Sequence, residues 1–223
     1  GYRSLYVNTT GTNNVAVGGS ALDANTTGGS NTAIGRNSLG ANTTGTANFA
    51  GGTSALESNT TASNNTGIGY FTLLSNTTGN DNTAVGANAL DSNTSGGDNT
   101  AVGRNALHAN TTSHNNTAVG TEAMASNTTG TANVAVGAYA LDANTTAHDH
   151  VAIGWAALST NTTGASNTAV GKSALTANTT GSASTAVGFQ SLQSNTTGDQ
   201  NTACGNNALR DNTTGQYNTA LGT

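Results

Sequence analysis

The chain has 223 residues, of which 34% are apolar and 4% aromatic, with 30 glycines and no proline, and this composition argues against a compact globular core. Only 7% of the residues are charged, so the chain also lacks the high charge that is typical of disordered proteins. The formal charge of −5, with five scattered basic residues, argues against a nucleic-acid groove and against insertion into or binding to an anionic membrane.

The tetrad Asn-Thr-Thr-Gly, or a one-residue variant of it, recurs every 17 residues without insertion or deletion, from Asn8 and Asn25 to Asn195 and Asn212. Only a repeat whose copies contact one another identically is held to one length, so each unit is expected to form one coil of a stack. We number the coil from 1 to 17, starting at this Asn, and its consensus is N-T-T-G-x-x-N-T-A-V-G-x-x-A-L-x-x.

The repeat predicts an all-β fold, a parallel β-roll or β-solenoid of 17-residue coils. Residues 1–223 are expected to form a single repeat domain of about 13 coils, as a segment of a longer fibre. Within a coil, the T-A-V piece and the piece around A-L are both strand-sized and are bounded by Gly and Asn. We therefore expect two short strands per coil and no helix, because no window has helical apolar spacing.

Four positions of the coil are expected to have structural roles. Position 11 is Gly in every coil, which indicates a positive φ or a close backbone approach. Position 15 is Leu except at Met124 and is the expected core residue, and Asn at positions 1 and 7 is expected to form amide ladders at the roughly 4.8 Å strand spacing. The representatives of these roles are Asn8, Asn25, Asn42, Asn82, Asn99, Gly18, Gly35, Gly86, Leu22 and Leu90.

The direction of the strand side chains is inferred from one coil in which Phe49 stands at position 8 and Gly51 at position 10. The gain in volume at one position and the loss at the other indicate that both share one pocket, which we assign to the interior with the Leu. Cys204, at position 10, is then a core residue. Position 9 would face outward, and its small residues favour an interchain face, although Ala also suits a tight, solvated strand. This face is represented by Ala16, Ala33, Ala84 and Ala101.

Exposed aromatic residues are candidates for contact with a sugar or a protein surface, because they gather at positions 12 and 13 among cationic residues. They are widely spaced, and isolated surface residues are the alternative interpretation. These candidates are Tyr70, Phe71, Tyr139, Trp155 and Phe189.

The sequence gives little support for a catalytic site or a metal-binding site. Alternation would place His148 and His150 on one face, where two His could hold a transition metal, but no third ligand is evident. No nucleophile-and-base arrangement, phosphate loop or carboxylate pair is present, so we expect no enzyme, no cofactor and no metal.

The segment N-T-A-V-G, as in Asn82–Gly86 and Asn99–Gly103, resembles the head repeats of trimeric autotransporter adhesins and the shaft repeats of related surface and phage tail fibres. The resemblance covers the whole chain and implies a left-handed parallel β-roll, a homotrimer, and a rigid stalk or head that binds host or prey surface glycans or proteins. It also implies an extracellular or cell-surface location, or a place in a virion tail fibre. Heads of that family repeat every fourteen or so residues, and the longer coil here leaves the handedness open.

Two other functions stay open at this point. Stacked Thr at positions 2 and 3 would form hydroxyl rows, as an ice-binding solenoid requires, although adjacent residues of a strand point to opposite sides. A self-assembling extracellular filament, joined end to end through strand edges, is the second alternative.

Overall fold

The computed structural model describes residues 1–223, as two compact units, Gly1–His114 and Asn115–Thr223. Every regular element is a strand of three residues. The first unit contains β1 (Val15–Val17), β2 (Thr32–Ile34), β3 (Phe49–Gly51), β4 (Thr66–Ile68), β5 (Thr83–Val85) and β6 (Thr100–Val102). The second contains β7 (Thr117–Val119), β8 (Val134–Val136), β9 (Val151–Ile153), β10 (Thr168–Val170), β11 (Thr185–Val187), β12 (Thr202–Cys204) and β13 (Thr219–Leu221).

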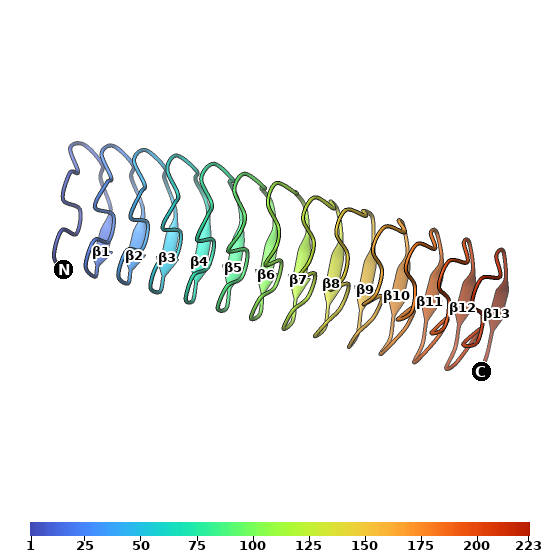
Figure 1. Ribbon diagram of the computed structural model, residues 1–223. Coiled ribbons are helices and arrows are strands. Elements are labelled where there is room, and N and C mark those ends of the chain that lie inside the picture. Colours follow the sequence, from blue (N-terminus) through green and yellow to red (C-terminus); the bar gives the residue numbers. More distant parts are fainter. The chain divides into compact units, whose positions relative to one another are not determined.

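Within each unit, every strand pairs in parallel with the strand of the next coil, 17 residues further along the chain. Ala16 pairs with Ala33 in the first unit, and Ala118 pairs with Ala135 in the second. Figure 1 shows the strands of each unit side by side, each joined to the next by a loop that closes the coil. The predicted fold class is confirmed, because each unit is a parallel β-solenoid in which equal positions of the coil lie in one column.

The second predicted strand of the coil is wrong, because the A-L piece forms a turn. Leu22 has a φ of 53°, in the left-handed region, and the same holds for Leu at position 15 in the other coils. This conformation costs a non-glycine residue about 1 kcal/mol or more. Hydrogen bonds offset the cost, since the Leu22 amide donates to the Ser38 carbonyl of the next coil (3.1 Å) and its carbonyl accepts from Asn25 (3.2 Å).

The interior of the coil is lined by positions 9, 14 and 15. Leu56 and Leu90 are fully buried, as are Ala84 and Ala89, which occupy positions 9 and 14 of one coil. A Cβ added at Gly67, the one position 9 without a side chain, would lie 3.5 Å from the side chain of Leu56. The small residues of position 9 therefore face the Leu column.

The predicted sidedness of the strands is thus wrong. The interchain face assigned to Ala16, Ala33, Ala84 and Ala101 lies on the interior side of the coil, and the last three of these residues have no exposed surface within the single chain. The physical reason is space, because an interior that already holds a Leu and two Asn amides per coil accepts only Ala or Gly beside them. The uniformly small residues at position 9 reflect this tight interior.

Positions 8 and 10 point outward instead. Phe49 is 38% exposed, and its ring lies 3.2 Å from the place where a Cβ on Gly51 would be. The exchange of volume between these two residues is therefore real, but it takes place on the outer surface. Cys204, at position 10, is likewise exposed and is not a core residue.

Candidate binding surfaces

The Asn column at position 1 forms a buried ladder. Asn25 Nδ2 donates to Asn8 Oδ1 (2.8 Å), and Asn42 Nδ2 donates to Asn25 Oδ1 (2.8 Å). Each amide also holds its own corner, since Asn25 Nδ2 donates to the carbonyl of Gly28 (3.0 Å). The amides are occupied by one another and by the backbone, which gives the column a structural role.

The Asn column at position 7 joins successive coils in a second way. The Oδ1 of Asn82 accepts from the backbone amide of Asn99 (3.1 Å), and the Nδ2 of Asn82 donates to the carbonyl of Gly96 (2.8 Å). Every buried side-chain nitrogen and oxygen of the structure has a hydrogen-bond partner. A polar interior is therefore compatible with a stable coil.

The glycine column at position 11 is required by both backbone and space. Gly18, Gly35 and Gly86 have φ values of 135°, 140° and 123°. A Cβ on Gly35 would collide with the carbonyl oxygen of Gly52 in the next coil. These glycines set the corner after each strand, which gives the column a structural role.

The His residues do not converge on a metal. His150 occupies the Asn column at position 7 and is buried, whereas His148 is exposed and lies 2.7 Å from the Asp149 carboxylate. The expectation that His148 and His150 share a face is wrong, because Asp149 between them has a φ of 61° and the segment is a corner. The structure contains no group of three metal-binding side chains.

The threonines of positions 2 and 3 differ in what their hydroxyls do. Thr26 Oγ1 donates to the carbonyl of Thr43 (3.0 Å), and Thr60 Oγ1 donates likewise to Thr77 (3.1 Å). The hydroxyls of position 2 are thus used to join coils, while Thr27 and the other residues of position 3 are exposed. Only one of the two expected hydroxyl rows is free to meet ice or another ligand.

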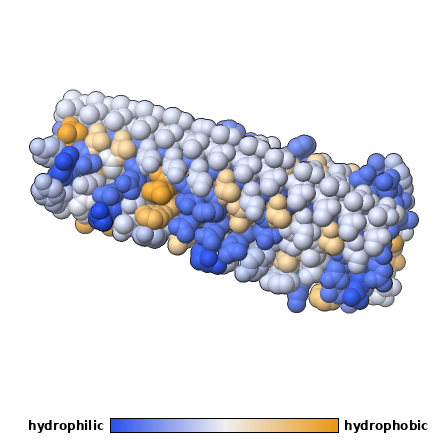
Figure 2. Space-filling view, viewed as in Figure 1, coloured by the Kyte–Doolittle hydropathy of each residue, from blue (hydrophilic) through white to orange (hydrophobic).

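The outer face of the strands, which we define as the side chains of positions 8 and 10, is uncharged and at least partly exposed, with Thr at most sites of position 8 and Val or Ile at most sites of position 10. Ile34 is 45% and Ile68 42% exposed in the first unit, and Ile153 is 39% exposed in the second. No charged residue occupies either position in any coil. On the surface viewed in Figure 2, orange apolar residues are scattered among pale residues and blue hydrophilic ones. This face was not predicted from the sequence, because the same residues were expected in the interior.

No protein-family model, curated protein or solved structure matches the chain. None of its elements is a helix that could cross a bilayer. What the molecule does is therefore inferred from its surfaces.

One shallow hollow of about 470 Å³ occurs in the first unit, where Gly40 replaces a larger side chain. Its two carboxylates already have partners, since Asp23 pairs with Arg3 (3.4 Å) and Glu57 accepts from Asn37 (3.4 Å). Both carboxylates are therefore engaged, Asp23 in an ion pair and Glu57 in a hydrogen bond from a neutral amide.

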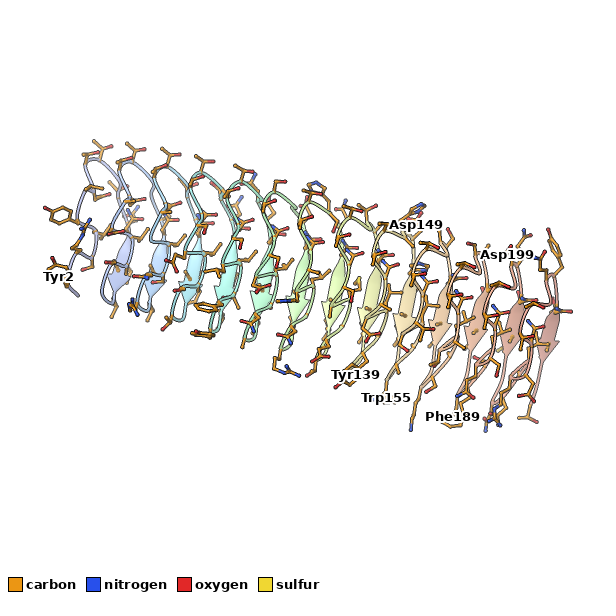
Figure 3. The ribbon with its side chains drawn as sticks, viewed as in Figure 1. Tyr2, Tyr139, Asp149, Trp155, Phe189 and Asp199 are labelled. Carbon is orange, nitrogen blue, oxygen red and sulfur yellow. The ribbon has the colours of Figure 1, made fainter.

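The aromatic candidates lie in two separate places. In the first unit, the rings of Tyr70 and Phe71 stack on each other, with centroids 3.8 Å apart. In the second, Figure 3 shows Tyr139, Trp155 and Phe189 along the same edge of the coils. Lys172 lies between the last two, with its Nζ 5.3 Å from the Trp155 ring and 6.0 Å from the Phe189 ring. Lys172 was not among the predicted site residues, although its place at position 12 of the intervening coil is visible in the sequence.

Proposed function

We propose that the chain is a structural and adhesive fibre segment without catalytic activity, in which three copies pack together through their outer faces. The observation that carries this proposal is the absence of charge from an exposed surface. Positions 8 and 10 hold no Asp, Glu, Lys or Arg in any coil, whereas the exposed position 12 holds Arg36, Arg104 and Lys172. Exposed surfaces that lack charge and carry a row of apolar residues, here the Val and Ile of position 10, mark interaction sites.

The energetics favour assembly through this face. Burying a half-exposed Val or Ile stabilises a complex by roughly 1 kcal/mol, at the usual coefficient for apolar area. The second unit offers one such residue from nearly every coil at position 10, namely Val119, Val136, Ile153, Val170, Val187 and Leu221. Because the strands are in register, the same contact repeats from coil to coil and the contributions add along the stack.

The number of copies follows from the resemblance to trimeric autotransporter adhesin heads, carried by segments such as Asn82–Gly86. The same resemblance supports a location outside the cell, on a cell surface or a virion tail. The adhesive role is assigned to the loops, because positions 5, 12, 13 and 16 vary in type from coil to coil while the interior stays constant. Variable exposed residues on a rigid scaffold are a common arrangement for binding.

The single cysteine tests the packing of the outer face without any mutation. Cys204 is exposed at position 10 of the isolated chain. In the proposed assembly its thiol is covered, so a maleimide reagent should label it much more slowly in the native protein than in urea. As a control, Thr163→Cys in a Cys204→Ser background places a thiol at the exposed position 3 and should react at the full rate. Rapid labelling of native Cys204 would show that the outer face is open.

A further inference from the structure

Three consecutive coils of the second unit place side chains of alternating kind in one column. Trp155, Lys172 and Phe189 each occupy position 12, directly after the glycine that ends the strand. Both rings are exposed, Trp155 by 51% and Phe189 by 43%. The two rings lie two coils apart, about 9.6 Å at the usual strand spacing. They form a linear platform rather than a pocket.

The ammonium of Lys172 is held between the two rings by cation–π contacts at 5.3 and 6.0 Å. Lys172 is exposed, and no carboxylate of the structure forms an ion pair with it. The acidic residues nearest in sequence, Asp149 and Asp199, occupy positions 6 and 5 of their coils and not position 12. The platform therefore offers one cation, fixed in place and open to an anionic group.

This combination selects a class of ligand. Flat aromatic rings accept the apolar faces of sugar rings, and their exposure on a rigid coil limits the entropy lost on binding. A ring, a cation and a second ring at equal steps match a polymer that presents a sugar face, an anionic group and another sugar face in turn. We infer that Trp155, Lys172 and Phe189 form a binding platform for an extended acidic polysaccharide, one whose sugars carry carboxylates.

This inference rests on the proposed adhesive function and names its ligand. The side chains have different roles: the rings of Trp155 and Phe189 stack on sugars, and Lys172 pairs with a uronate carboxylate. Tyr139 lies on the same edge, one coil before Trp155, and extends the platform (Figure 3). The paired rings of Tyr70 and Phe71 in the first unit contact each other and have no cation between them. They therefore serve as an aromatic control surface that should not distinguish acidic from neutral sugars.

Trp155 is the only tryptophan, so its intrinsic fluorescence reports on the platform without a label. Titration of the whole chain with a β-1,4-linked oligomannuronate should change this fluorescence in a saturable way. The neutral β-1,4-linked mannooligosaccharide of equal length should bind up to about fivefold more weakly, which is the contribution of one exposed ion pair. Lys172→Gln should bring the two affinities together, Phe189→Ala should weaken both, and Tyr70→Ala should change neither.

Three results would overturn the inference. The first is no saturable response to the oligomannuronate, and the second is equal affinity for the acidic and the neutral sugar in the unaltered chain. The third is equal affinity for polyglutamate, which would show that the site reads charge alone. Light scattering on the same samples keeps the two proposals apart. A fluorescence response from a monomer would support the platform and reject the trimer. A trimer without a fluorescence response would support the trimer and reject the platform.

Discussion

The ring Nδ1 of His150 accepts a hydrogen bond from the backbone amide of Asn167, at 3.1 Å. The Asn side chains of the same column accept the equivalent bond through Oδ1, as Asn133 does from the amide of His150 (3.0 Å). His150 thus replaces an Asn of the buried ladder while keeping its acceptor. To do so, Nδ1 must carry no proton, so the buried ring must be neutral.

The pKa of His150 is lowered to about 4, mainly by burial, with a smaller contribution from the charge of His148. The hydrogen bond with the backbone of Gly164 and the charge of Asp149 act in the opposite direction. In the unfolded chain a His has a pKa near 6.5, so below that pH the unfolded state binds a proton that the folded state does not. The stability that His150 contributes is therefore complete above pH 6.5 and is lost as the pH falls towards 4.

We expect the free energy of unfolding to fall by about 3 kcal/mol between pH 7 and pH 4 through this residue. Urea unfolding at several pH values measures it, and His150→Asn, which restores the residue usual at position 7, should remove this component. The raised pKa values of Asp91 and Asp142 act with the opposite sign but are present in both proteins, so they cancel in the difference. An identical pH dependence in the two proteins would contradict the role of His150.

The amide ladder should be a main source of stability in the first unit. Asn76 Nδ2 donates to Asn59 Oδ1 (3.0 Å) and to the Gly79 carbonyl (3.0 Å), and its Oδ1 accepts from Asn93 (2.8 Å). Asn76→Ala leaves these buried partners unsatisfied and should cost roughly 2 to 4 kcal/mol in urea unfolding. Thr78→Ala, at the exposed position 3 of the same coil, is the control and should change stability by no more than about 0.5 kcal/mol.

The glycine column should tolerate no side chain. Gly35→Ala combines a φ of 140° with a collision against the Gly52 carbonyl, and it should destabilise the chain by about 3 kcal/mol or prevent folding. Gly19→Ala is the matched variant, since a Cβ there meets nothing within 4 Å. Its thermal unfolding should stay within a few degrees of the unaltered protein. Equal effects of the two substitutions would show that the corner is not closely packed.

The side on which each strand residue lies can be tested within one strand. Ala84 is fully buried beside the Leu column, whereas Val85 is partly exposed on the outer face. Ala84→Leu overfills the interior and should cost about 3 kcal/mol, while Val85→Ile should be nearly neutral, since Ile occurs at position 10 in other coils. Urea unfolding of the two variants compares them directly. A tolerated Leu at position 84 would restore the outward assignment of the Ala column.

The sequence alone predicts the stacking but not the orientation of the strands. The constant period identifies the solenoid, and the unbroken Asn and Gly columns identify the ladders and corners, because each depends on contacts between equal positions. Alternation shows that Phe49 and Gly51 share a face, but it does not show which face is inside. Leu22 in the left-handed region could not be expected from propensity, which disfavours that conformation for Leu.

The candidate binding surfaces could likewise be predicted only in part from the sequence. Trp155 and Phe189 could be found as exposed aromatic residues in a variable column, but the placement of the Lys172 ammonium over both rings depends on rotamers that the sequence does not give. The outer face escaped prediction because its apolar residues look like core residues until the space inside the coil is known.

Solution mass measured by light scattering shows whether the outer face is an interface between copies. A trimer packed through this face should have a mass three times the 21.7 kDa of the chain. Val170→Glu, which places a charge at position 10, should then give smaller species, whereas Thr163→Glu at the exposed position 3 should leave the mass unchanged. A folded, stable monomer at 21.7 kDa in dilute solution would contradict assembly through the outer face.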